Sequence, residues 1–165
     1  MLNSQSSIKG LNVLEFSFKL NDEPMSSLKM GSERSFDAFS GLGKHVNRVL
    51  STCIANHGPI PKGEYYIFDR QSGGMLGPLR DIFSDKDEWF ALYADDSSID
   101  DETFCDEVKR GQFRLHPKGP LGVSQGCITI NSYSDFQILR ALLKGVETEV
   151  IPEVGLECYG KITVC

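Results

Sequence analysis

An alternation of apolar and polar residues is the clearest pattern near the start of the chain. Within residues 11–20, apolar side chains occupy every second position from Leu14 to Leu20, and polar side chains lie between them. This period of two predicts a half-buried strand. Short runs rich in β-branched and aromatic residues, separated by Gly, Pro, Asp and Ser, predict further strands at 64–69, 89–93, 112–116, 127–130 and 159–164.

Two segments instead carry apolar residues at helical spacing. The first, 44–56, has its apolar positions at Val46, Val49, Leu50, Cys53 and Ile54. The second, 134–145, has them at Phe136, Leu139, Leu142 and Leu143, with Ser134 as the expected N-cap and Gly145 as the expected C′ residue. We expect both stripes to contact the core. The balance predicts a mainly β (α+β) fold, a sandwich or curled sheet with one or two short helices.

Length and charge narrow the function classes. The chain has 165 residues, no internal repeat and no linker, which predicts a single domain over 1–165. Its net charge of -6 and the lack of a basic stretch argue against nucleic-acid binding. No apolar run is long enough to cross a bilayer, so we expect no membrane insertion. The first residues lack a basic region followed by an apolar one, so we expect no secretory signal.

Cysteine spacing and acidic residues leave several possibilities open. The five cysteines, at 53, 105, 127, 158 and 165, form no C-x-x-C pair, and their odd number leaves at least one thiol free in a monomer. If the other four pair, three connectivities are possible. The sequence contains neither an H-E-x-x-H motif nor a His/carboxylate cluster with metal-ligand spacing. We therefore expect no metal site, and no cofactor. The acidic segment 95–107 is interpreted as a solvated loop, with a lid or partner-binding segment as the alternative.

The candidate chemistry lies in 113–130, "FRLHPKGPLGVSQGCITI". His116 ends one predicted strand and Cys127 begins another, with a Gly- and Pro-rich connection between them. If the two strands are neighbours, about 4.8 Å apart, the imidazole and the thiol come close together. A histidine can then take the thiol proton and return it to a leaving amine. Gly126 lets the backbone approach a substrate carbonyl, and the Cys127 amide is a candidate oxyanion donor. A buried core cysteine is the competing interpretation.

Two motifs carry a family resemblance. The Ser-x-Gly-Cys-Ile around Cys127, preceded by a His-x-x-Gly turn, resembles the catalytic motif of the L,D-transpeptidase (YkuD-like) family. Upstream, "GPIPKGEYYI" (58–67) resembles that family's turn and strand, in the same order. With "FDAFSG" (36–41) and "WFALY" (89–93), the chain is most similar to the L,D-transpeptidase-related toxin effectors of type VI secretion. The motif-bearing part covers about 36–165.

The resemblance implies a YkuD-like fold and a cysteine enzyme acting on the stem peptides of peptidoglycan. Cys127 is then the nucleophile and His116 the base, with a backbone carbonyl orienting the imidazole; Ser124 and Gly126 shape the loop. L,D-carboxypeptidase and D-amino-acid exchange activities on stem tetrapeptides follow. Candidate contacts to substrate carboxylates are Arg114, Lys118 and Arg70.

The resemblance also implies delivery and partners. It implies a toxin made in the producer cytoplasm, secreted with a component of the secretion apparatus and active in the periplasm of a target cell, with an immunity protein protecting the producer. Two positions depart from the family pattern: Gln125 replaces a histidine and Thr129 an arginine. They leave open the balance of hydrolysis and transfer. The alternatives are another cysteine peptidase, although papain- and NlpC-like chains place cysteine before histidine, and a non-catalytic wall-binding or interaction module.

Overall fold

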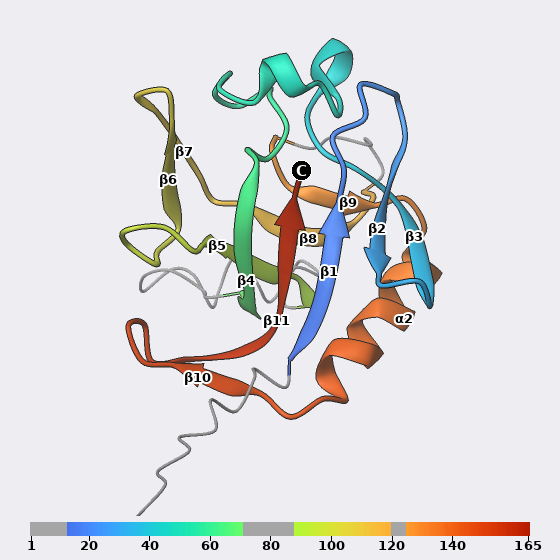
Figure 1. Ribbon diagram of the computed structural model, residues 1–165. Coiled ribbons are helices and arrows are strands. Elements are labelled where there is room, and N and C mark those ends of the chain that lie inside the picture. The colour runs from blue at the N-terminus through green and yellow to red at the C-terminus, as the bar shows by residue number, and fades with distance from the viewer. Residues whose placement is uncertain (1–12, 71–87, 120–124) are drawn as a thin grey trace, which may run out of the picture.

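The structure is a computed structural model that describes residues 13–70, 88–119 and 125–165. Within these ranges nine strands form one sheet that curls into a barrel (Figure 1). They are β1 (Leu14–Phe18), β2 (Ser26–Met30), β3 (Arg34–Phe39), β4 (Gly63–Asp69), β5 (Phe90–Ala94), β8 (Arg114–Pro117), β9 (Ile128–Ile130), β10 (Glu149–Ile151) and β11 (Leu156–Val164). A separate hairpin, β6 (Glu102–Cys105) and β7 (Val108–Gly111), projects beside it. The helical elements are α2 (Tyr133–Lys144) and the 3-10 helices η1 (Gly43–His45) and η2 (Val49–Ser51).

The sheet closes through its first and last strands. Its order is β1-β2-β3-β9-β8-β5-β4-β11-β10, and β1 also pairs with β11. The β1–β11 and β8–β9 pairs are parallel, whereas the other pairs are antiparallel. The expectation of a mainly β fold built on a curled mixed sheet is confirmed.

The core fills the interior of this barrel. The alternation predicted for the first strand is present: Phe16 and Phe18 are buried, and Glu15 and Ser17 are exposed. Apolar side chains from the other strands join them in one cluster, including Leu28, Ile67, Leu92, Leu115 and Ile162. Burial of this apolar surface is the main force that stabilises the barrel.

The bounds of α2 were predicted to within one residue, but its N-cap residue was not predicted correctly. Ser132, rather than Ser134, is the N-cap, and its hydroxyl accepts a hydrogen bond from the Asp135 amide at 3.3 Å. Gly145 is the C-cap in right-handed helical conformation, not a left-handed C′ residue. The helix buries Phe136, Leu139 and Leu143, so its apolar stripe does contact the core.

The helix predicted over 44–56 was wrong. The segment forms η1, η2 and turns, and Asn47 and Asn56 have positive φ, which an α-helix cannot include. Its apolar stripe is not a core contact as a whole: Val49 packs on the core, but Leu50 is 98 % exposed. The spacing of apolar residues was helical, yet local backbone turns outweighed it.

Strand predictions were confirmed at every segment chosen, with bounds shifted by up to three residues. The strands that the sequence did not reveal are β2, β3, β6, β7 and β10. The acidic segment 95–107 is not wholly a loop, because β6 lies within it and pairs with β7. Charged residues such as Glu102, Lys109 and Arg110 interrupt the apolar period on which strand prediction depends.

Candidate functional site

The register of two neighbouring strands, β8 and β9, places His116 and Cys127 on one face of the sheet. In the parallel β8–β9 pair, Leu115 lies opposite Ile128 and His116 opposite Thr129. Side chains alternate along a strand, so Cys127, two residues before Thr129, faces the same way as His116. The two are diagonal neighbours, roughly 8 Å apart at Cα by ordinary strand spacing. The predicted adjacency of their strands is confirmed.

The His116 imidazole is buried and oriented by its own strand. Its Nδ1 lies 2.7 Å from the carbonyl oxygen of Pro117, and its side chain is only 5 % exposed. Because a carbonyl only accepts, Nδ1 carries the proton in this contact, and the neutral ring keeps its lone pair on Nε2. The partner is therefore a backbone carbonyl, as the resemblance implied. A neutral imidazole with a lone pair on Nε2 is the form that a general base requires.

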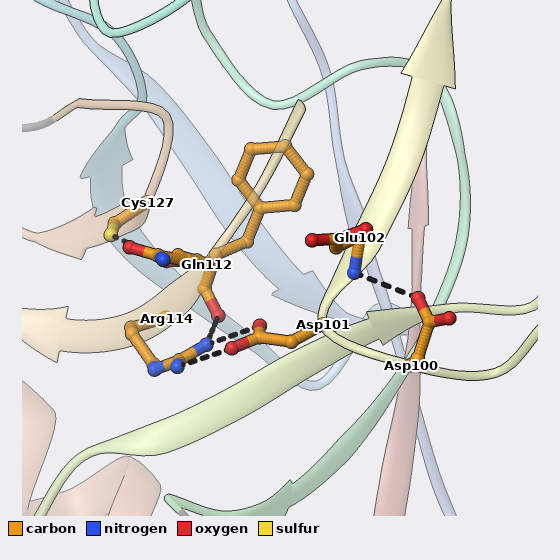
Figure 2. Close-up of polar contacts among 7 residues, drawn as sticks. Asp100, Asp101, Glu102, Gln112, Arg114 and Cys127 are labelled. Atoms are coloured by element: carbon orange, nitrogen blue, oxygen red, sulfur yellow. Dashed lines mark hydrogen bonds and ion pairs between the residues drawn. The ribbon is translucent and has the colours of Figure 1, made fainter. Parts of the chain in front are cut away.

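Cys127 is a partly exposed thiol just before β9 and is in no disulfide. Its Sγ lies 4.0 Å from the carbonyl oxygen of Gln112 (Figure 2). Burial raises the pKa of the Cys127 thiol, and the Arg114 amide and guanidinium counteract that rise. A thiol with a raised pKa is mostly protonated at neutral pH, so it needs a base to become a nucleophile. The core-cysteine interpretation is weakened because the side chain is not fully buried.

A glycine is required before this cysteine. Gly126 is buried with φ of +106, a conformation that L side chains rarely adopt. A Cβ there would meet Arg110 Nη2 at 2.7 Å and the Phe113 ring at 3.0 Å. The backbone at Gly126 thus packs closely against the side chains of Arg110 and Phe113, and this contact positions the turn before Cys127.

Arg110 is a buried cation held by carbonyl groups. Its side chain is 4 % exposed; Nη2 donates to Gly58 O at 2.9 Å, and Nη1 contacts the oxygens of Pro59 and Thr52. Within the described ranges no carboxylate forms an ion pair with it, and burial lowers the pKa of its guanidinium. The guanidinium therefore joins β7 to the 52–59 segment from which these carbonyls come.

A disulfide joins the same two parts of the chain. Cys53 is bonded to Cys105, and Cys127, Cys158 and Cys165 are in no disulfide. The prediction that at least one thiol is free is confirmed. The sequence left the pairing open because connectivity depends on the tertiary arrangement.

Arg114, a predicted substrate contact, is already paired. Its guanidinium makes two 2.7 Å hydrogen bonds to the Asp101 carboxylate and a 2.8 Å bond to the Phe113 carbonyl oxygen (Figure 2). Asp101 also accepts the Gln112 amide on its backbone oxygen at 2.9 Å. Gln112 has a positive φ of 56, so this bond supports a strained residue whose carbonyl contacts Cys127.

The other predicted site residues lie in different surroundings. Lys118 is exposed just after β8, and its amide donates to Ile130 O at 2.8 Å. Arg70 is half-buried at the end of β4, where its amide donates to Trp89 O at 3.3 Å. Ser124 lies outside the described residues. Substrate binding by Lys118 and Arg70, and the role of Ser124 in shaping the catalytic loop, stay predictions.

The two departures from the family pattern also differ. Gln125 is exposed, whereas Thr129 is fully buried opposite His116. The Thr129 hydroxyl makes no hydrogen bond within the described part of the chain. An arginine at this position would have to bury its charge beside the histidine, so the packing here suits a small side chain.

Four residues near the site were missed by sequence reasoning: Trp89, Asp101, Arg110 and Gln112. Asp101 was hidden in an acidic segment with no distinguishing spacing, and Arg110 lies in a strand that was not predicted. Trp89 was noted only as part of a strand-like motif. Each reaches the site through strand pairing or hydrogen bonding, which a single sequence does not display.

Two kinds of feature are absent from the described residues. No group of three or more His, Cys, Asp or Glu side chains there is arranged to hold a metal ion. Of the helices in these ranges, none has the length and apolar character needed to cross a membrane.

Comparison with known proteins gives one family. The model of the Tlde1 domain matches residues 34–154, which include the strands and turns that position His116 and Cys127. No curated protein and no solved structure matches the chain. The match covers well over half of the sequence. The Tlde1 domain is typical of a family of type VI effector toxins that act on peptidoglycan. The chain therefore belongs to the Tlde1 domain family.

Proposed function

We propose that this chain is a cysteine enzyme that hydrolyses or exchanges the terminal residue of peptidoglycan stem tetrapeptides, an L,D-carboxypeptidase and L,D-transpeptidase. One observation carries the proposal: a histidine with its Nδ1 bound to a carbonyl shares a sheet face with a partly exposed cysteine that is in no disulfide. The family match supports the target, since the Tlde1 domain acts on peptidoglycan.

The chemistry proceeds through a thioester. His116 Nε2 takes the proton from Cys127, and Sγ attacks the carbonyl at the L-centre of diaminopimelate. The tetrahedral oxyanion is stabilised by the Cys127 amide and a neighbouring loop amide. The C–N bond breaks, the imidazolium returns its proton to the D-alanine amine, and a thioester remains. Attack by water then gives a tripeptide stem, and attack by a D-amino acid gives an exchanged stem.

The substrate carboxylates need cationic partners. Arg114 lies closest in register to Cys127, but a substrate carboxylate must displace Asp101 to form two hydrogen bonds with it. Lys118 and Arg70 are the other proposed partners. In the protein without substrate, the Arg114 guanidinium is thus already bound to Asp101.

The proposed context is interbacterial competition. The enzyme is delivered by type VI secretion, acts in the periplasm of the target cell, and is blocked in the producer by an immunity protein. The family match supports an effector with an immunity partner. Expression directed to the periplasm should therefore arrest growth, whereas cytoplasmic expression should not. Equal harmlessness in both compartments would count against the toxin role.

A digest of purified stems tests the enzyme directly. Diaminopimelate-containing tetrapeptides should yield tripeptides, and exchanged tetrapeptides when a D-amino acid is added, as measured by mass spectrometry. Cys127→Ala and His116→Ala should reduce both products at least a thousandfold, because nucleophile and base act as a unit. Cys165→Ser, which changes another free thiol, should retain full turnover. Unchanged turnover in Cys127→Ala would falsify the assignment; wall binding that survives without any turnover would favour the non-catalytic module.

A further inference from the structure

Trp89 lies directly across the sheet from His116. In the antiparallel β5–β8 pair, Phe90 lies opposite Leu115. Extending this register by one residue places Trp89 opposite His116, on the face that His116 shares with Thr129 of β9. Three neighbouring strands thus present Thr129, His116 and Trp89 in a row, with the histidine in the middle.

The indole and the imidazole are stacked. Their ring centroids are 4.2 Å apart and their planes differ by 18°. The Pro117 carbonyl fixes the direction of Nδ1 within the ring plane, and the indole face fixes the plane itself. Together the two contacts determine where the Nε2 lone pair points, which neither contact does alone.

The segment that carries Trp89 is itself anchored. The Trp89 carbonyl accepts the Arg70 amide at 3.3 Å. The preceding residue, Glu88, accepts hydrogen bonds on Oε2 from Gln137 Nε2 at 3.0 Å and Tyr133 Oη at 3.2 Å, both on α2. The segment that carries the indole is therefore positioned by Arg70, just after β4, and by α2, as well as by β5, which follows it.

We infer that Trp89 is a positioning residue for the base: its indole face sets the plane of the His116 imidazole and stabilises the imidazolium that forms when the thiol proton is transferred. A cation over the face of tryptophan is attracted by the ring quadrupole, and the attraction grows as water is excluded. This inference rests on the proposed role of His116 and adds a residue that prepares it. Trp89 itself transfers no proton.

Other ionisable groups border this pair, and the test must separate them from His116. They are Glu88, Asp101, Arg114, Cys127 and Tyr133. None of these is removed by a change at His116, so a signal that disappears with the imidazole belongs to the imidazole.

The intrinsic tryptophan fluorescence of the chain can measure this contact. Trp89 is the only tryptophan, and a protonated imidazole in contact with an indole quenches its fluorescence. Emission of the full chain should fall as the pH is lowered through the titration of His116. The step should be absent in His116→Gln and unchanged in His57→Gln, which alters a histidine outside the site. A flat wild-type curve, or a step that persists in His116→Gln, overturns the inference.

Alkylation of Cys127 tests the consequence. Iodoacetamide labelling, followed at each cysteine by mass spectrometry, needs no peptidoglycan substrate. Trp89→Leu should slow labelling of Cys127 at neutral pH roughly tenfold, the size expected for losing a desolvated cation–π contact. Trp89→Phe, which keeps an aromatic face, should recover most of the rate. Labelling of exposed Cys165 in the same sample is the internal control and should not change.

The outcomes separate the two proposals. Equal Cys127 labelling rates in Trp89→Leu and the wild type overturn the positioning role, whatever the activity on stems. If the fluorescence step and the labelling difference are present but stems are not processed, the positioning role stands and the proposed substrate fails.

Discussion

The barrel and the region beside its site are held together in different ways. The barrel is stabilised by one large cluster of buried apolar side chains and by continuous strand pairing. The second region, which we call the cross-linked flank, comprises residues 43–59 and the hairpin with its ends, 101–112. It exposes large apolar side chains such as Leu50 and Phe104, and it depends on a disulfide, the carbonyl contacts of Arg110 and the Asp101–Arg114 pair.

This difference teaches where single substitutions act. In the barrel, the stabilising free energy is distributed over many contacts, and no one residue determines the placement of the site. In the cross-linked flank, a few bonds hold Gln112 beside Cys127 and Arg110 against Gly126. Changes in the flank should therefore disturb the reactivity of Cys127 while the barrel stays folded. Three predictions test this contrast.

Removing the disulfide should have the largest effect. The double change Cys53→Ser and Cys105→Ser releases a cross-link between residues 52 apart, and should lower the free energy of unfolding by about 3 kcal/mol. Urea denaturation followed by circular dichroism measures it. Reducing the unaltered protein with dithiothreitol should give the same loss, and Cys165→Ser should give none. A midpoint unaffected by either treatment would contradict the role of the cross-link.

Arg110→Met should have the next largest effect. The change removes the donors to buried carbonyls of the 52–59 segment, which should cost about 2 kcal/mol on urea denaturation. The matched control is Lys109→Met. Lys109 is the neighbouring residue, and its ion pair with Glu102 is exposed, so its loss should change stability by less than about 0.5 kcal/mol. Equal losses in the two variants would show that Arg110 does not fasten the flank.

Asp101→Asn should have the smallest effect on stability and a distinct effect on pH dependence. Loss of one charge from a half-buried ion pair should cost about 1 kcal/mol. The negative charge of Asp101 contributes to raising the pKa of Cys127, so neutralising it lowers that pKa and shifts the labelling of Cys127 toward lower pH. Rates of iodoacetamide labelling against pH provide the measurement.

The exposed neighbour Glu102→Gln is the control for that experiment, because it removes one negative charge outside the Arg114 contact. Its labelling profile should stay close to that of the wild type. A shift of the Asp101→Asn profile toward higher pH would mean that freeing Arg114 disturbs the site more than the lost charge helps it.

Prediction from sequence succeeded where the chain follows a period and failed where local turns or distant pairing decide. The period of two identified β1, runs rich in β-branched and aromatic residues identified β4 and β11, and the apolar stripe identified α2. The same method misassigned 44–56, because turns at Asn47 and Asn56 override helical spacing. The polar hairpin was hidden by its charges.

The candidate site divides in the same way. His116 and Cys127 were found because they lie in one short motif, and their strands are indeed adjacent. Trp89, Asp101 and Arg110 come from segments whose approach depends on sheet register and a disulfide. Register is set by packing of the whole barrel, so one sequence without its fold could not reveal these neighbours.

The position of β11 has a consequence for how the chain folds. This last strand pairs with β1, β4 and β10, and its pairing with β1 joins residues from nearly opposite ends of the sequence. Such contacts have high sequence separation, and proteins dominated by them fold slowly. During synthesis the barrel cannot close until residues near Val164 have left the ribosome. The scaffold of the site is thus completed only once all of β11 has been synthesised and paired with β1.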